Sequence, residues 1–598
     1  MKKNRILYAI AGFMALVSIV SCEDYLDTPE DLGLDDKQVF TNYESFEGAI
    51  MAAYWAVHNY VYDPQDWNSE IGSLSDEAQH LNATAPPVVN TYNQGIWQDE
   101  EFLEFGFDFT PDNGYERKSR MQPAGEGVVG IRMVNLVLSN FDKLSEFPNL
   151  GEISEADMKN YLKGEAYVLR AWHYFEIIRR FGGIFYMDKP FTSEELIDST
   201  RRSYRECTEW MVTDLDSAAK LLPTSWPENF HGRATKTSAR AIKTMALLYA
   251  ASPSMSVFDG GDNAYSTDLA QRAAEAALEA MTEAESSAFY QMYDLANYTE
   301  NWYSLASGIS KEALWAPPQS KYGSTNFNAG VGWYLPHWDG GWKIWSAPTQ
   351  NAVDWFETTN GLAIQDDVTF DPNDPYSNRD PRLSQFVYKN GDAMYITPGA
   401  KVPTLESWRG GVHFEDAFTV GSHWTGYLHR KHRWNGANNA DNIGGFNRIF
   451  PLIRYAQLYL DFAEAANEVA GPTGNITAGG KTMNAVQALN VVRNRVGMPD
   501  VNSLYTGSKD ALRERIRNER AVELYQEMHR WHDLRRWRIA EDKLKAIYKA
   551  EIIKSGSSFT YSKKEIEGAR VFEEKHYWYP FSTNEMQITQ NFTQNPGW

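Results

Sequence analysis

The chain has 598 residues, with 57 Lys and Arg against 79 Asp and Glu, and a formal net charge of −22 at pH 7. Binding to nucleic acid needs clustered Lys and Arg against the phosphates, so this acidic balance argues against a nucleic-acid partner. With only two cysteines the chain has no disulfide framework, and its stability depends on a packed core.

The start of the chain predicts a lipoprotein signal. Three basic residues lie among the first five, and residues 6–20 form an apolar run that ends just before Cys22. A positive start, a short apolar run and a small residue at the cut are typical of a secretory signal, and the run is shorter than the ~20 residues that span a bilayer. A cysteine at the cut resembles a bacterial lipoprotein box, which implies removal of residues 1–21 and lipidation of Cys22. An ordinary secretory signal with a chance cysteine is the alternative.

Amphipathic helices are predicted toward both ends of the mature chain. Apolar residues recur at spacings of three and four from Tyr161 to Ile178, and Gly182 with Gly183 ends this helix. Asp510 is expected to cap the helix that follows the one at residues 485–496. The same periodicity predicts helices over residues 203–222, 235–251, 265–282, 455–469 and 485–496, with stops at Gly471 and Gly497.

The stretch between these helices, residues 285–450, is rich in Gly, Pro, Asn, Asp and Trp, and its periodic segments are short. A loop-rich block of this length on a helical frame tends to be functional. The sequence therefore predicts a mainly α fold of antiparallel helix pairs with a large loop-rich insert, although no clean 34-residue period marks a repeat. We divide the chain into a signal at 1–21, helical parts at 22–284 and 451–598, and the insert at 285–450.

Tryptophan is concentrated in the insert, where seven of the 20 lie between positions 302 and 355, interleaved with Gly and Asn. A flat aromatic ring matches the C–H face of a pyranose, while neighbouring amides and carboxylates bind its hydroxyls. Roughly half of these rings are expected in the core, above all Trp315 and Trp355, which lie in short apolar segments. The candidates for sugar contact are Trp333, Trp338, Trp342, Asp339 and Asn328.

Two motifs permit a metal interpretation. His529-x-x-His532, followed by Asp533, could place both imidazoles on one helix face. We favour a buried polar network with Arg520, Glu523 and Arg535 instead. Residues 371–380 are acidic enough for calcium but lack the glycine and terminal glutamate of an EF-hand, so they are interpreted as turns. No metal and no cofactor are expected.

Catalytic signatures are absent from the sequence, which contains no HExxH, P-loop, GxSxG or dinucleotide-binding glycine motif. A glycoside hydrolase needs only two carboxylates at the right distance, and a chain with 79 acidic residues cannot be excluded on this ground. A hydrolase therefore stays an alternative to a protein that binds without cleaving.

Eight segments, in chain order from the first helix to the C-terminus, together resemble the SusD/RagB family of Bacteroidetes outer-membrane lipoproteins. They are YLKGEAYVLRAWHYFEIIRRFGG (161–183), RATKTSARAIKTMALLYAA (233–251), PTQNAVDWFETTNG (348–361), NRDPRL (378–383), IRYAQLYLDFAEAANE (453–468), ALNVVRNRVGMP (488–499), IRNERAVELYQEMHRWHDLRRW (516–537) and YWYPFSTNEMQITQNFTQNPGW (577–598).

The resemblance implies tetratricopeptide-like helix pairs carrying an inserted ligand-binding region. It implies a lipid-anchored, surface-exposed protein that forms a lid on a SusC-like TonB-dependent transporter, and the acidic residues Glu23 and Asp24 are similar to the export signal of such lipoproteins. The usual ligands of the family are oligosaccharides, and some members handle peptides instead. Family members bind and deliver without cleaving.

The family also places part of its ligand surface in an early loop region. In this chain that region holds a second group of aromatic residues beside several asparagines. The candidates here are Tyr62, Trp67 and Trp97.

Overall fold

The computed structural model of this chain describes residues 40–57, 71–81, 88–97, 123–191, 199–227, 230–304, 310–318, 346–393, 404–414, 424–432, 447–589 and 591–598. In these residues helices dominate, and the strands are short and paired only in twos. The mainly α fold expected from the sequence is confirmed. None of the described helices combines the length and apolar character needed to cross a membrane. The signal and Cys22 lie outside the described residues.

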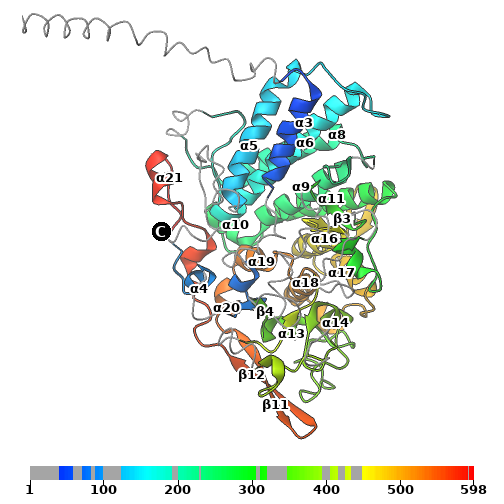
Figure 1. Cartoon of the computed structure of the whole chain (residues 1–598), viewed down its shortest axis with the longest axis vertical. Coiled ribbons are helices and arrows are strands. Elements are labelled where there is room, and N and C mark those ends of the chain that lie inside the picture. Colours follow the sequence, from blue (N-terminus) through cyan, green and yellow to red (C-terminus); the bar gives the residue numbers. More distant parts are fainter. Residues whose placement is uncertain are drawn as a thin grey trace, which may run out of the picture.

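The scaffold is a stack of helices in which each long helix packs against the next one along the chain (Figure 1). The stack continues past the insert, because α11 packs against α16, and α16 packs against α17 and α18. Its members are α3 (Tyr43–Trp55), α5 (Pro123–Asn140), α6 (Glu155–Phe181), α8 (Tyr204–Leu221), α9 (Lys236–Ala251), α11 (Thr267–Ser286), α16 (Tyr455–Ala470), α17 (Ala485–Asn494) and α18 (Lys509–Glu523).

Local sequence signals set the ends of these helices. Ser203 and Glu206 form a reciprocal capping box at the start of α8. Gly182 ends α6 with a φ of +80°, a conformation that costs glycine little. The expected cap at Asp510 is wrong: the Ser508 side chain accepts from the Ala511 N–H, and Asp510 lies in the first turn.

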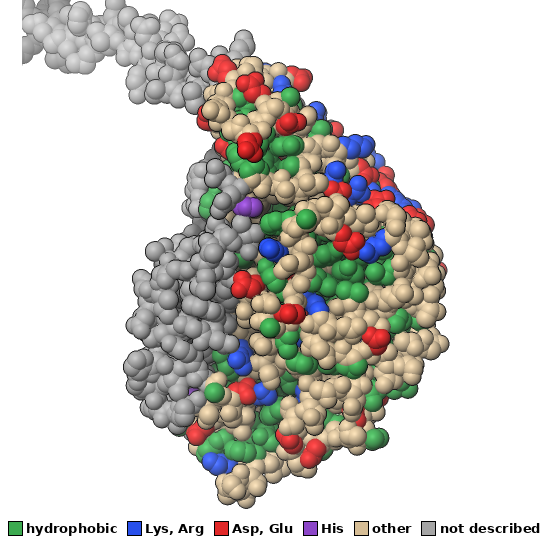
Figure 2. All heavy atoms as spheres, turned by 90° about the vertical axis from the view of Figure 1, so that its right-hand side faces the viewer, with side chains coloured by type: hydrophobic (Ala, Val, Ile, Leu, Met, Phe, Trp, Pro, Cys, Tyr) green, Lys and Arg blue, Asp and Glu red, His purple; other side chains and the backbone are tan. Residues whose placement is uncertain are grey.

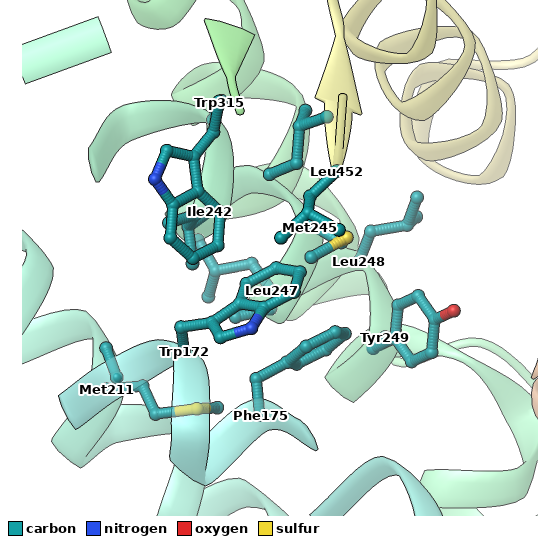
Figure 3. Close-up of a cluster of buried hydrophobic side chains, with 14 of the residues drawn as sticks. Trp172, Phe175, Met211, Ile242, Met245, Leu247, Leu248, Tyr249, Trp315 and Leu452 are labelled. Atoms are coloured by element: carbon teal, nitrogen blue, oxygen red, sulfur yellow. The ribbon is translucent and has the colours of Figure 1, made fainter. Parts of the chain in front are cut away.

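The main core lies between the helices of the stack, and Figure 3 shows one part of it. Trp172 of α6 meets Trp315 edge to face, with ring centroids 4.5 Å apart. Ile242 and Met245 of α9 lie beside this pair (Figure 3). Trp315 is 1% exposed, so its predicted core position is confirmed. The first tryptophan of the insert after Trp302 thus holds the insert to the scaffold.

The insert and its neighbours are tied together by short antiparallel strand pairs between distant segments. Trp355 is partly buried against a second core cluster that contains Phe356, Phe386 and Tyr525. Residues 371–380 form turns, as expected. The strand pairs are β1 (Ala78–His80) with β4 (Ser346–Pro348), β2 (Tyr303–Ser304) with β7 (Asn447–Arg448), β3 (Ala313–Trp315) with β8 (Ile453–Arg454), and β5 (Val387–Tyr388) with β6 (Leu428–His429).

Two hairpins and several short helices complete the described structure. The hairpin of β11 (Tyr548–Ser555) and β12 (Ser558–Glu565) projects from the lower end of the molecule (Figure 1). On the face shown in Figure 2, acidic and basic side chains are interspersed rather than gathered into one block. The other elements are β9 (Ile476–Ala478), β10 (Lys481–Met483), α4 (Val88–Asn93), α10 (Pro253–Phe258), α13 (Gln350–Trp355), α14 (Pro381–Phe386), α19 (Arg530–Arg536), α20 (Ala540–Lys543), α21 (Thr583–Ile588) and the 3-10 turns η2 (Ile71–Leu74), η5 (Phe141–Lys143), η7 (Tyr298–Asn301), η11 (Ser503–Tyr505) and η12 (Glu574–Tyr577).

Candidate functional site

The two segments predicted to bind ligand are anchored on one pair of strands. β1 pairs antiparallel with β4, with His80 opposite Ser346. Ser346 directly follows the tryptophan-rich stretch of the insert, and the turn η2 that leads into β1 directly follows the early aromatic segment. The Thr349 hydroxyl donates to the carbonyl of Asp76, 273 positions earlier, and fixes the two strands further. The fold therefore brings the bases of both candidate segments together.

Beneath these strands lies a small apolar cluster that we call the loop base. Its members come from several described ranges and lie near the ends of those ranges, so these distant segments meet on one buried platform. Loops that start from a rigid platform are a common arrangement for ligand binding. The loop base consists of Leu81, Ala347, Tyr388, Leu405, Trp424 and Leu428, with Phe414 packed against it.

A chain of neutral polar groups lies beside the loop base, at the chain neighbours of Ala347 and Leu428. The Ser346 hydroxyl lies 3.1 Å from His429 Nε2, and His429 Nδ1 lies 2.7 Å from the Tyr525 hydroxyl. Burial lowers the pKa of His429 to about 3, so this imidazole is neutral near pH 7. The arrangement positions β4 on β6 and on the turn that follows α18, without bringing a charge to the surface.

A dense network of buried ion pairs lies below the loop base. Arg454 contacts Glu312 at 2.7 Å, Glu523 at 2.9 Å and Glu527 at 2.7 Å, and Lys431 contacts Glu527 at 2.6 Å. Burial raises the pKa of Glu527, but Arg454 and Lys431 more than offset it and hold the pKa below its usual range. These charges neutralise one another inside the protein, which makes the network a structural support rather than a ligand surface.

The His529-x-x-His532 motif lies in similar surroundings. Both imidazoles are buried, and burial lowers their pKa values well below the usual range. Arg520 contacts Asp533 at 2.7 Å, and Arg535 donates to the carbonyl of Tyr577 at 2.6 Å. Asp533 and Arg520 thus form a buried polar pair, as expected, whereas Glu523 pairs with Arg454 and Arg382 instead. Among the described residues, no cluster of His, Cys, Asp and Glu could hold a metal ion.

Most of the predicted sugar-contacting residues fall in parts of the chain that the structure does not describe. Their anchoring on β1 and β4 follows from the described flanks alone. The residues outside the described ranges are Trp333, Trp338, Trp342, Asp339, Asn328, Tyr62 and Trp67.

Trp97 requires a correction, because it lies in the core and is only 3% exposed. Its ring stacks on Trp598 at a centroid distance of 5.9 Å and meets His576 at 4.4 Å and Trp531 at 5.8 Å. Its indole N–H donates to the carbonyl of Tyr92 at 3.0 Å. With its faces and its polar atom occupied, this ring is unable to stack on a sugar.

The structure also contains a pocket, lined in part by residues 310–318 of the insert, that the sequence did not predict. The pocket is small, with a volume of ≈ 80 Å³. Gly232 allows the close approach there, because it has a φ of +90° and a Cβ at this position would lie 3.1 Å from the Cα of Pro318. The lining includes Trp226, His231, Phe289, Tyr290, Trp315 and Pro318.

Two family models and two curated relatives match this chain. A family model described as "SusD family" matches residues 299–598, and another described as "Starch-binding associating with outer membrane" matches residues 127–248. Two curated proteins of Formosa agariphila, SusD-like protein P2 and SusD-like protein P38, are 22% and 24% identical to this chain. They align over 90% and 87% of this chain and over 91% and 90% of their own lengths.

Solved structures show the same fold. A SusD-like protein from Bacteroides fragilis superimposes with a TM-score of 0.72 at 22% identity, over 95% of this chain and 99% of that chain. A SusD-like carbohydrate binding protein from the same species gives a TM-score of 0.65 at 23% identity, over 92% and 99%.

Proposed function

Since this chain belongs to the SusD family, we propose that it is a cell-surface lipoprotein that captures oligosaccharides and passes them to a SusC-like TonB-dependent transporter of the outer membrane. The observation that carries the proposal is the shared anchoring of two aromatic-rich segments on β1 and β4 above the loop base. The printed names of its relatives, which include a starch-binding family and a carbohydrate-binding protein, support a glycan as the ligand.

The proposed contacts are stacking rings supplemented by short polar side chains. Trp333, Trp338 and Trp342 would stack on sugar rings, with Asp339 and Asn328 binding hydroxyls, and these five residues form the main site. Tyr62 and Trp67 would extend it, because their segment leads through η2 into β1, the partner strand of the same pair. Trp97 no longer belongs to this set.

Binding without cleavage is part of the proposal. The acidic side chains nearest to β1 are occupied: Arg530 binds Asp76 through two contacts at 2.7 and 2.8 Å, and Glu77 accepts the backbone N–H of Gln526 at 2.6 Å. Burial raises the pKa of Glu77 to about 8. A glycosidase needs two carboxylates that reach the substrate, and these two residues are committed to the fold.

The test is a glycan screen with soluble protein that lacks residues 1–22. Affinity gels or a glycan array should identify a polysaccharide that retains the protein, and no reducing sugar should appear during long incubation with it. Release of reducing sugar that is lost on replacing one Asp or Glu would support the hydrolase alternative. Binding to peptides with no binding to glycans would support the peptide alternative.

Substitution of a single proposed stacking tryptophan tests the same proposal at residue level. Trp338→Ala should weaken glycan binding about five- to 150-fold, as expected for the loss of one stacked ring. Trp55→Ala is the matched control, because Trp55 is 68% exposed on α3 of the helical scaffold, away from the loop base. Equal glycan affinity of the two variants would remove Trp338 from the site.

A further inference from the structure

The small pocket described above lies where the helical scaffold meets the insert. Its three sides are the connection between α8 and α9, the chain that follows α11, and the segment from Ser310 to Pro318. The described lining shares no residue with the loop base, so the pocket is not part of the platform under the main site. We call it the scaffold pocket.

Hydrogen bonds hold the sides of the scaffold pocket together. The Ser238 hydroxyl donates to the carbonyl of Leu314 at 2.8 Å, which ties α9 to β3. The hydroxyls of Thr235 and Tyr290 lie 2.9 Å apart and tie the start of α9 to the chain after α11. These contacts make the pocket preformed, and a preformed pocket loses little freedom when a ligand enters.

Aromatic rings form one wall of the scaffold pocket. The ring of Phe289 meets that of Tyr290 edge to face at 5.1 Å, and the His231 imidazole lies nearly parallel to it with centroids 6.2 Å apart. All three side chains are half buried. Ala288, directly before them, has a φ of +55°, a left-handed conformation that is unfavourable for a residue with a side chain. Backbone strain of this kind is found where a fold holds neighbouring side chains in a particular place.

Arg233 is the one Lys, Arg, Asp or Glu in the described lining, and its charge is already neutralised. Its guanidinium contacts Glu165 at 2.5 Å and Glu47 at 2.8 Å. It also lies over the Trp226 ring, 4.9 Å from the centroid, and the Trp226 N–H donates to the carbonyl of Ala234 at 2.7 Å. Trp226 therefore closes the pocket, and the Arg233 cation is not available to an acidic ligand.

Two polar groups of the lining have hydrogen-bonding capacity left. The Trp315 N–H is buried and has no acceptor among the described residues, and its nitrogen lies on the edge of the ring away from Met245 and Leu452 (Figure 3). A buried donor without an acceptor is unfavourable, and a ligand oxygen in the pocket would supply one. The Tyr290 hydroxyl, paired with Thr235, can still accept a further hydrogen bond.

The size and chemistry of the scaffold pocket fit one neutral sugar ring. At ~10–15 Å³ for each water, its ≈ 80 Å³ holds about five to eight waters, close to the space that a monosaccharide displaces. An aromatic wall matches the C–H face of a pyranose, and hydroxyl and N–H groups bind its oxygens. We propose that the scaffold pocket is a second site, which binds one neutral monosaccharide unit. The choice of a sugar as ligand rests on the proposed function.

The probes are the methyl glycosides of glucose, galactose, mannose and xylose, with glucuronate as an acidic counterpart. Ligand-observed NMR follows their binding to soluble protein that lacks residues 1–22 and carries Trp338→Ala, which removes a proposed stacking ring of the main site. At least one neutral glycoside should bind, with a Kd on the order of 1 mM for so small a ligand. Glucuronate should not displace it.

Two substitutions in this background test the pocket. Phe289→Leu keeps most of the apolar volume but removes the flat ring, so it should weaken glycoside binding about two- to twelve-fold. Tyr290→Phe removes the hydroxyl and should weaken binding about two- to twelve-fold as well. It keeps the ring, so it serves as the second variant if Phe289→Leu lowers stability.

Phe147→Leu is the matched control. That ring is also half buried on the helical scaffold, where it packs on Tyr43 at 6.1 Å, and its loss should leave glycoside binding unchanged. Unchanged affinity in both pocket variants, or an equal loss in the control, would overturn the inference. So would binding of none of the four glycosides, or capture of a proline-rich peptide with no sugar bound.

The proposed function and this inference fail in different ways. If a polysaccharide retains the wild-type protein but no glycoside binds the Trp338→Ala protein, the main site stands and the scaffold pocket is refuted. If no polysaccharide retains the wild-type protein while a glycoside binds in a manner that depends on Phe289, the proposed function fails and the scaffold pocket stands.

Discussion

At the scale of single residues, Trp97 is held by aromatic rings from the C-terminal part of the chain. Trp97→Ala should therefore lower the free energy of unfolding by about 3–5 kcal/mol, since it removes a large buried ring and leaves a cavity. Urea unfolding followed by circular dichroism measures this loss. Trp408→Ala is the comparison, because that ring is only half buried and should cost less. A loss below about 1 kcal/mol for Trp97→Ala would contradict its place in the core.

The buried His173 makes the fold sensitive to acid. Its Nε2–H donates to the carbonyl of Ala53 at 3.0 Å, and burial lowers its pKa to about 4. The unfolded chain, with a pKa near 6.5, binds more protons than the folded chain between these values, so stability falls as the pH drops from about 6.5 toward 4. The expected loss from this group is about 2 kcal/mol between pH 7 and pH 5.

The measurement is the free energy of unfolding at pH 7 and pH 5 for wild-type protein and for His173→Gln. The variant is expected to be less stable at pH 7 and to show a smaller difference between the two pH values. An unchanged difference would mean that the imidazole is already protonated in the folded state or that other groups carry the acid sensitivity.

At the scale of elements, α5 and α6 approach each other closely because α5 carries a glycine at the contact. A Cβ at Gly130 would lie 2.2 Å from Nε2 of His173. Gly130→Ala gains up to about 1 kcal/mol of helix propensity, but the clash should cost more, for a net loss of about 1–3 kcal/mol. Gly48→Ala in α3 is the control, because nothing lies within 4 Å of its added methyl, and it should stabilise the protein. Thermal melts of both variants check this, and a gain for Gly130→Ala would contradict the close contact.

The long helices could be predicted because their signals are local. The periodicity between Tyr161 and Ile178 belongs to α6, and α8 and α9 begin within one residue of the expected positions. Ser508 was missed as a cap because Asp510 also suits the start of a helix. The choice of the N-cap is a choice among residues of one turn, and sequence patterns locate the exact end of a helix poorly.

The candidate site was harder to predict, because its construction depends on contacts between distant segments. β1 and β4 are three residues each, which is too short for a visible alternation. Trp97 lies in a segment of aromatic and polar residues that resembles a binding loop, and only the rings near the C-terminus show that it is core. The β11–β12 hairpin does have a local signal, a Gly-containing turn at Ser555–Ser558 between alternating strands, and it was overlooked.

At the scale of the whole molecule, the proposed anchoring depends on Cys22. Cys22→Ala should leave the protein without lipid and no longer attached to the outer membrane, because the lipid on Cys22 is the proposed attachment to the bilayer. Palmitate labelling and membrane fractionation measure both effects, with the Cys207→Ala variant as a control at the buried free cysteine. Labelling and outer-membrane fractionation that persist in Cys22→Ala would refute the lipid anchor.

The packing of Trp97 against the last residues also bears on the order in which the protein folds. Successive helices of the scaffold mostly meet near neighbours in the chain, so we expect this part to form early in folding. The segment around Trp97 cannot form its contacts as early, because His576, which contacts the carbonyl of Gly95, lies 481 positions further along the chain. The contacts of Trp97 with His576 and Trp598 form only after the C-terminal residues are available. We therefore expect the burial of Trp97 to be among the last steps of folding.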